Sequence, residues 1–192
     1  KLKANRLRDR RFPVIGAAEG LSHDNVRAVL HARDGSVWLA TAGGGLNRLL
    51  DGRIESIRKA DGLPTDEVAS LFESPDGTIW AGTYTAGIAC VRDGRVVGVL
   101  GRANGLPSLD VRAILRDRNG NVWVATASGL ARTRDGRRFE RVVPPEGASL
   151  NAVVCLLEGK DGTLWFGTSG DGLVRYSGGT FRVLTTRDGL VS

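Results

Sequence analysis

The side chains of this chain that could bind or react fall in a few short polar stretches. These are His23, Asp24 and Asn25; Asp66 and Glu67; Tyr84; Asp110; Asn151; and Asp171. Carboxylate, amide, imidazole and phenol groups donate and accept hydrogen bonds, so a group of them can hold a polar small molecule. An alternative is that Asp24, Asp66 and Asn151 only fix their own turns, because Asp and Asn side chains bond to nearby backbone groups.

Catalysis and metal binding have little support in the sequence. The two histidines, His23 and His31, lie in one stretch of the chain, and no Cys/His spacing typical of a metal site occurs. The sequence also contains no phosphate-binding loop, dinucleotide fingerprint or serine elbow. We therefore expect no catalytic residues, no metal and no cofactor.

The polar residues must be positioned by the strands and turns of a sequence repeat. The stretch at 34–41 (DGSVWLAT) recurs at 76–83 (DGTIWAGT), 119–126 (NGNVWVAT) and 161–168 (DGTLWFGT). It contains all four tryptophans of the chain, which are 42, 43 and 42 residues apart: Trp38, Trp80, Trp123 and Trp165. A fixed period of about 40–45 residues indicates a repeat architecture such as a β-propeller.

Each repeat predicts four short strands. In the second repeat they are residues 68–72, 78–83, 88–91 and 95–100, separated by turn residues such as Asp76-Gly77 and Asp93-Gly94. We expect an all-β fold: four four-stranded antiparallel blades at about 21–58, 63–100, 106–143 and 148–185, as part of a larger propeller ring. The four tryptophans should occupy equivalent buried positions between blades, because each removes much apolar area from water.

The regions outside these blades suggest that the ring continues. Residues 11–16 resemble residues 138–143, so we expect a stray outer strand of an earlier blade there, within a propeller segment at 12–192. The chain closes where another blade would begin. If the protein ends there, we expect two copies to associate, as in a closed ring of eight blades, since large exposed apolar faces are unusual in monomers.

Charge and cysteine content give little support for a nucleic-acid partner or for a disulfide bridge. The net charge is +6, and residues 1–11 hold six Lys or Arg against one Asp. We interpret these residues as a basic arm or linker rather than a nucleic-acid site, which would show aromatic residues among the charges. We expect Cys90 and Cys155 to be small buried hydrophobic residues without a bridge. No apolar run of membrane-spanning length and no signal peptide are visible.

The repeat resembles that of the two-component regulator propeller family over about residues 12–190. In the second repeat the matching positions are Gly62-Leu63-Pro64, Val68, Asp76-Gly77, Trp80, Gly82-Thr83 and Gly87-Ile88. The fourth repeat departs by having Gly147-Ala148-Ser149 in place of Gly-Leu-Pro, and the third is one residue shorter between Trp123 and Leu130. The resemblance implies a periplasmic ligand-sensing domain of a bacterial receptor, linked to the membrane only through a transmembrane segment that this sequence lacks. In some members the ligand is a carbohydrate.

Alternate loops of an antiparallel meander share one end of each blade. The longer loops, such as 59–67 and 83–87, carry most of the polar residues named first, so we expect the ligand at that end. Two alternatives remain open. One is a scaffold for protein–protein contacts or dimers; the other is a lyase propeller of the streptogramin-inactivating kind, which has similar repeats but needs histidines from several blades.

Overall fold

The computed structural model describes residues 14–145 and 149–191, which form four antiparallel sheets of four strands each. The strands are β1 (Val26–His31), β2 (Val37–Thr41), β3 (Leu46–Leu50) and β4 (Arg53–Ile57) in blade 1; β5 (Val68–Glu73), β6 (Ile79–Thr83), β7 (Ile88–Arg92) and β8 (Arg95–Leu100) in blade 2; β9 (Val111–Arg116), β10 (Val122–Thr126), β11 (Gly129–Thr133) and β12 (Glu140–Val142) in blade 3; and β13 (Val153–Glu158), β14 (Leu164–Thr168), β15 (Leu173–Ser177) and β16 (Thr180–Leu184) in blade 4. The predicted all-β propeller fold is confirmed.

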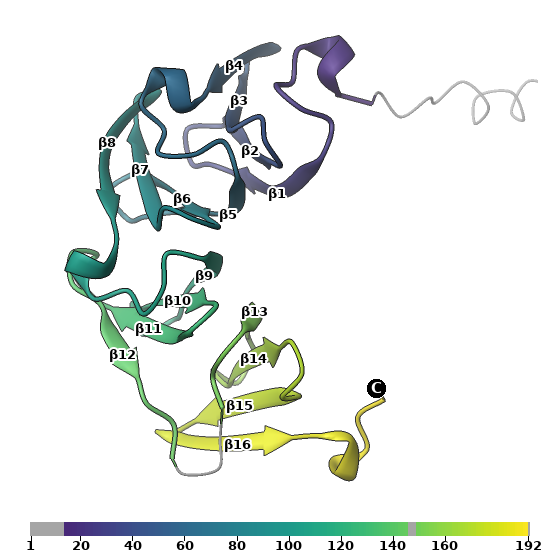
Figure 1. Cartoon of the computed structure of the whole chain (residues 1–192), viewed down its shortest axis with the longest axis vertical. Helices are drawn as coiled ribbons and strands as arrows, with labels where there is room; N and C mark the ends of the chain where they lie inside the picture. Colours follow the sequence, from purple (N-terminus) through teal and green to yellow (C-terminus); the bar gives the residue numbers. More distant parts are fainter. Residues whose placement is uncertain (1–13, 146–148, 192) are drawn as a thin grey trace, which may run out of the picture.

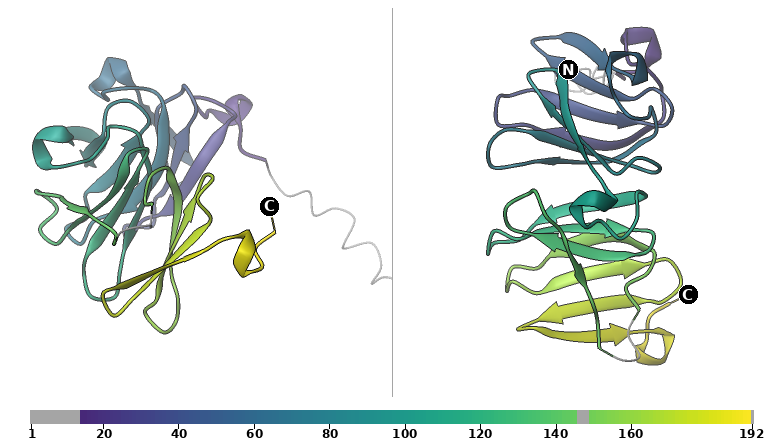
Figure 2. Two further views of the ribbon diagram at one scale, coloured as in Figure 1. Left: turned by 60° about the horizontal axis from the view of Figure 1, so that its bottom comes forward. Right: turned by 60° about the vertical axis from the view of Figure 1, so that its left-hand side comes forward.

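The blades follow one another around an arc (Figure 1). The first strand of each blade lies on the concave side, where β5 contacts both β1 and β9, and β9 contacts β13. The fourth strands lie on the convex side, and the right-hand view of Figure 2 shows the sheets stacked face to face. The arrangement buries apolar residues between sheets that could not bury them alone.

Two kinds of turn shape each blade. The turn between the first two strands is closed by an Asp: in blade 2, Asp76 accepts hydrogen bonds from the hydroxyl of Ser74 and the backbone N–H of Thr78. The second is a short 3-10 helix: Lys59–Asp61 leads from β4 to blade 2 and Arg102–Asn104 from β8 to blade 3, while Ala17–Glu19 precedes β1 and Thr186–Asp188 follows β16. Each ends at a glycine with positive φ, such as Gly62 at 98°, which explains the Gly of the Gly-Leu motif.

The core consists of three apolar clusters, one between each pair of successive blades. Trp38, Trp80 and Trp123 each lie in the cluster that their blade shares with the next one. Trp165 is only half-buried, so the prediction of four equivalent buried tryptophans is wrong for this one. Its side of blade 4 has no blade packed against it among the described residues.

The same uncovered side of blade 4 corrects a second expectation. Cys90 is buried as predicted, but Cys155 is exposed. Cys155 pairs with Gly167 in the ladder, and its neighbour Leu157 pairs with Trp165. Leu157 is 62% exposed, so Cys155 lies on the face that lacks a covering sheet.

The predicted stray strand at 11–16 remains a prediction, because the described residues do not include the earlier blade with which it would pair. Residues 11–13 lie outside the described residues, and Val14, Ile15 and Gly16 are not in a strand. Val14 is 80% exposed. A fourth strand of a blade exists by pairing with its third, and no such partner occurs in the described part of the chain.

Candidate functional site

The two ends of the blades differ. One end, here the loop face, carries the loops between second and third strands and the starts of the first strands. There each loop bonds to the start of the next blade: the N–H groups of Gly43 and Gly45 donate to the carbonyl oxygen of Asp66 (3.1 and 2.9 Å), and that of Gly87 to Leu109 (2.9 Å). The opposite end, here the turn face, carries the short hairpins. The loop face is therefore a continuous bonded surface across blades.

Side chains from two blades meet on the loop face around Tyr84. Arg27 of β1 donates to the carboxylate of Glu67 in blade 2 at 2.7 Å. Its guanidinium carbon also lies 4.7 Å from the ring centroid of Tyr84, as in a cation–π contact. Tyr84 remains 38% exposed, so the ring offers surface to a ligand.

Blade 3 extends this cluster with a second arginine–carboxylate pair. Arg112 of β9 contacts Asp110 with two nitrogen atoms, at 3.2 and 3.0 Å. The hydrogen bond to Asp110 raises the pKa of Arg112. We call Arg27, Glu67, Tyr84, Asp110 and Arg112 the Tyr84 cluster.

The two arginines of the Tyr84 cluster were missed from the sequence. Arg27 and Arg112 each lie 11 residues before the repeat tryptophan, and each is the extra residue of a β-bulge in the first strand of its blade. A bulge removes a residue from the ladder and re-aims its side chain. Ala69 and Val154 occupy the same position in blades 2 and 4, so comparison of the repeats would have singled out the arginines.

Asp24 and Asp66 fix the chain before their blades. Asp24 accepts a hydrogen bond from the backbone N–H of Ala17 at 2.6 Å, and Asp66 one from Lys59 at 2.7 Å. Both lie 14 residues before the repeat tryptophan, where blade 3 has Leu109 and blade 4 has Asn151. The geometry favours the turn-fixing interpretation for these two aspartates.

In the described structure, no side-chain hydrogen bond joins the other candidate residues to the Tyr84 cluster. His23 accepts a hydrogen bond at Nδ1 from the N–H of Asn25 (3.0 Å), within its own loop. The N–H of Asn151 donates to the hydroxyl of Ser149 at 3.3 Å. Asp171 lines a hollow of about 720 Å³ on blade 4. Across the described ranges, no three His, Cys, Asp or Glu residues are grouped as metal ligands would be.

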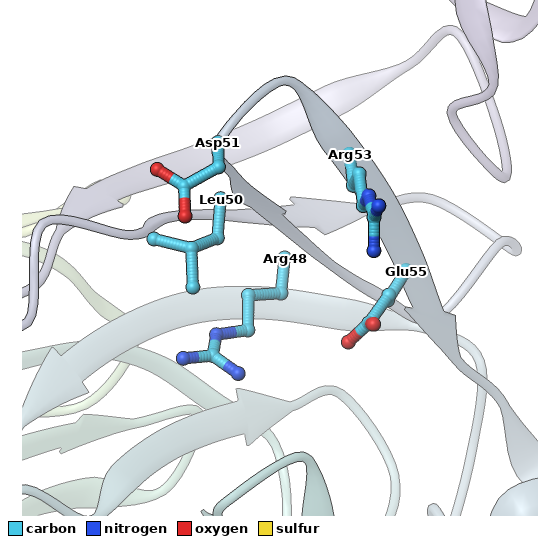
Figure 3. Close-up of a pocket in the computed structure, with 5 residues that line it drawn as sticks. All are labelled: Arg48, Leu50, Asp51, Arg53 and Glu55. Carbon is cyan, nitrogen blue, oxygen red and sulfur yellow. The ribbon is translucent and has the colours of Figure 1, made fainter.

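A hollow of about 460 Å³ on blade 1 is formed by residues of β3, β4 and their connecting turn (Figure 3). Its lining residues are Arg48, Leu50, Asp51, Arg53 and Glu55. Arg48 is already engaged, because it donates to Asp34 at 2.8 Å and stacks over Trp38. All five lining residues belong to blade 1, whereas the Tyr84 cluster draws its side chains from three blades.

The fold is shared with solved bacterial propellers. The extracellular domain of a hybrid two-component system from B. thetaiotaomicron matches with a TM-score of 0.74 and 24% identity, over 91% of this chain and 24% of that chain. A one-component system domain of the same organism gives a TM-score of 0.70 and 24% identity, over 84% of this chain and 24% of that one. This chain therefore spans about a quarter of the length of either structure.

More distant matches include an inactive virginiamycin B lyase from Staphylococcus aureus, with a TM-score of 0.64 and 19% identity over 85% of this chain and 57% of the lyase. No curated protein matches the sequence significantly. No helix within the described ranges combines the length and apolar character needed to cross a membrane.

The repeats themselves match one family. The family model of the two component regulator propeller matches residues 62–85, 105–128 and 147–170, which begin at the loop before each of blades 2 to 4 and extend just beyond the second strand. These segments contain Trp80, Trp123 and Trp165 with their Asp-Gly or Asn-Gly turns. Segments of blades 2 to 4 are thus similar to two-component regulator propeller repeats.

Proposed function

We propose that this chain is part of the ligand-sensing domain of an extracytoplasmic bacterial receptor, and that the Tyr84 cluster contacts the ligand. The proposed compartment is the periplasm, and the proposed ligand is a carbohydrate or another polar small molecule. The family match and the extracellular origin of the similar structures support this proposal.

One observation carries the proposal: three blades contribute ionised and aromatic groups to one patch of the loop face. Arg27, Glu67, Tyr84, Asp110 and Arg112 come from blades 1, 2 and 3. Convergence of loops from several rigid elements is typical of binding sites. A partly exposed ring beside hydrogen-bonding groups suits a sugar, which has apolar C–H faces and many hydroxyls.

A thermal-shift screen against neutral and acidic mono- and oligosaccharides tests the proposal. A ligand that binds only the folded state raises the melting temperature with concentration. We expect Tyr84→Ala to abolish this shift and Tyr84→Phe to retain part of it. Asp171→Asn, on the same face but in blade 4, is the matched control and should keep the full shift.

Two results would contradict this function. The first is a saccharide shift that Tyr84→Ala and Arg27→Ala leave unchanged. The second is a flat screen together with concentration-dependent association of the protein, which favours the scaffold alternative.

A specific observation supports association as a second function. Val29 on blade 1 is 63% exposed, and Val154 and Leu157 on blade 4 are 42% and 62% exposed. We propose that further blades of the same protein or a second copy cover these faces. Light scattering of the 192-residue protein should show association; a monomer at high concentration would exclude the second-copy version.

A further inference from the structure

The tryptophan of blade 2 differs from the other three in what lies over its ring. Arg48 stacks over Trp38 at 5.6 Å, Arg132 over Trp123 at 5.6 Å and Arg175 over Trp165 at 6.0 Å. In each case the arginine is the residue paired with the tryptophan on the neighbouring strand. The residue paired with Trp80 is Cys90, so no guanidinium covers its ring from this position.

Blades 1 and 2, and likewise blades 3 and 4, are joined by an arginine that bonds to a glutamate and to two backbone carbonyl oxygens of the next blade. We call this arrangement the ionic bracket; blades 2 and 3 lack it. Between blades 1 and 2, Arg33 donates to Glu73 at 2.9 Å and to the carbonyl oxygens of Ser74 and Pro75. Between blades 3 and 4, Arg118 bonds to Glu158, Gly159 and Lys160 in the same way.

At the middle contact both bracket positions have changed. Pro75 stands five residues before Trp80, where blades 1 and 3 have the arginine. Arg116 stands seven residues before Trp123, where blades 2 and 4 have the glutamate. The contact between blades 2 and 3 therefore has neither the arginine nor the glutamate of the ionic bracket.

These changes coincide with a pocket of about 420 Å³ between blades 2 and 3 at the turn face. Its apolar lining includes Trp80, Cys90, Val97, Leu100 and Val122. The turn between β11 and β12 closes one side: a Cβ added to Gly136 would lie 3.0 Å from the six-membered ring of Trp80. The backbone of this turn therefore lies directly against the indole.

Three arginines of blade 3 line the pocket: Arg116, Arg134 and Arg137. Within the described residues, the side chains of Arg116 and Arg137 make no hydrogen bond or ion pair. Arg134 donates to the neutral amide oxygen of Asn121 at 2.9 Å. Three guanidinium groups thus remain without a carboxylate.

The two carboxylates that line the pocket are already occupied. Asp76 is paired with Arg92 and accepts from Ser74. Asp135 accepts hydrogen bonds from the N–H groups of Arg137 and Arg138 and from the hydroxyl of Thr133. The donors to Asp135 are neutral and leave its charge in place, so three guanidinium groups outnumber the one carboxylate without an ion pair and the net charge at the pocket is positive.

We propose that this pocket binds a small amphipathic anion, with a flat apolar group beside Trp80 and a carboxylate, sulfonate or phosphate on the arginines. An apolar pocket with a few convergent polar groups is the usual form of a small-molecule site. Guanidinium groups bind such anions through paired, planar hydrogen bonds. The site lies at the turn face, opposite the Tyr84 cluster, and does not depend on the function proposed there.

The probe for the test is naphthalene-1-sulfonate, titrated into the ¹⁵N-labelled 192-residue protein while the four indole N–H signals are recorded by NMR. Each signal is assigned by a Trp→Phe variant. We expect a saturable shift of the Trp80 signal and a much smaller change at Trp165, which is half-buried on an uncovered apolar face. Neutral 1-naphthalenemethanol should bind at least about tenfold more weakly, because one good ionic contact accounts for such a factor.

Variants separate the site from general apolar binding. Arg116→Ala/Arg137→Ala should weaken binding of the sulfonate at least about tenfold. The matched control, Arg182→Ala/Arg187→Ala on blade 4, should leave it unchanged. Cys90→Arg installs the residue that the other blades carry and should abolish binding by covering Trp80.

The proposal is overturned if Trp165 rather than Trp80 responds, if the neutral compound binds equally well, or if the Arg116/Arg137 variant binds like the parent. Because Arg116 and Arg137 are exposed, that variant remains decisive even if Cys90→Arg does not fold.

Discussion

The inner blades 2 and 3 and the outer blades 1 and 4 use the same strand motif but bury different parts of it. All five residues of β6 and of β10 are buried. In β2 the buried side chains include Trp38 and Ala40, whereas in β14 they are Leu164 and Phe166, which belong to the opposite side of the sheet. Successive side chains of a strand point to opposite faces. An inner blade therefore buries both faces, and an outer blade only the one that has a neighbour.

The comparison shows that the motif does not determine how much its tryptophan stabilises the fold. Trp123 packs against Phe166 and Tyr176 of blade 4, with ring centroids 5.7 and 5.4 Å away. Trp165 has Arg175 over its ring but no following blade among the described residues. The contribution of the side chain should follow the presence of a neighbour.

The strongest test of this comparison is to truncate both tryptophans. Trp123→Ala should lower the free energy of unfolding by about 3–5 kcal/mol, the usual loss for a buried Trp. Trp165→Ala should cost less than half as much, because its side chain is already partly in water. Urea unfolding followed by circular dichroism measures both. Equal losses would break the comparison.

The buried carboxylate of Asp117 provides a second test of the comparison, within inner blade 3. Asp117 accepts hydrogen bonds from Asn121 and from the indole N–H of Trp123, each at 2.8 Å. Burial raises the pKa of Asp117, but these hydrogen bonds outweigh burial and the pKa is lowered overall. Asp117→Ala leaves buried donors unpaired and should cost about 2–3 kcal/mol.

The control for Asp117 is the exposed turn residue Asp161, whose replacement by Ala should lower stability clearly less than the replacement of Asp117. A loss at Asp117 no larger than at Asp161 would contradict the role assigned to its hydrogen bonds. Blade 1 shows the alternative state: Ala32 occupies the position of Asp117, and the indole N–H of Trp38 is buried without a partner in the described structure.

A smaller effect is expected from the ionic bracket between blades. Arg118→Ala should destabilise by about 1 kcal/mol, because Arg118 is half-exposed and such pairs are screened by water. Lys160→Ala, at the same repeat position in blade 4, should change stability by less than about 0.5 kcal/mol. Thermal unfolding at low and high salt measures both losses of stability. A loss for Arg118→Ala no larger than that for Lys160→Ala would mean that the ionic bracket does not stabilise the protein.

The smallest expected effect is that of replacing a turn aspartate. It should be the same in an inner blade as in an outer blade. Hydrogen bonds from the hydroxyl of Ser74 and then from the N–H of Thr78 lower the pKa of Asp76 to about 2, and those from the hydroxyl and the N–H of Thr163 lower the pKa of Asp161. A lowered folded-state pKa contributes stability above the unfolded value near 4, and this is lost as the pH falls toward 2. Asp76→Asn and Asp161→Asn should both be less stable than the parent at pH 6, and the difference should shrink steadily as the pH falls to 2.

Melting temperatures at the two pH values measure this pair of variants. A difference as large at pH 2 as at pH 6 would mean that the charge of the aspartate is not the cause. A response confined to blade 2 would mean that the turn depends on its neighbours, contrary to the comparison.

The sequence by itself determined the repeat, the strands and the turns. These depend on contacts within a few residues, such as Ser74 with Asp76, or on the local φ preference of Gly62. For the same reason the sequence could predict Glu67, Tyr84 and Asp110 as loop-face residues. It could not select them from the larger set, because Asp24 and Asp66 have the same residue type but bind their own turns.

Tertiary structure decided which side chains meet and which are covered. Arg27 and Arg112 join the Tyr84 cluster because β-bulges re-aim them and loops of adjacent blades lie beside them. Trp165 is half-buried and Cys155 is exposed because no sheet lies against their face in the described chain. Burial and side-chain contact between blades depend on residues about 40 positions apart, and a motif of eight residues contains no information about such neighbours.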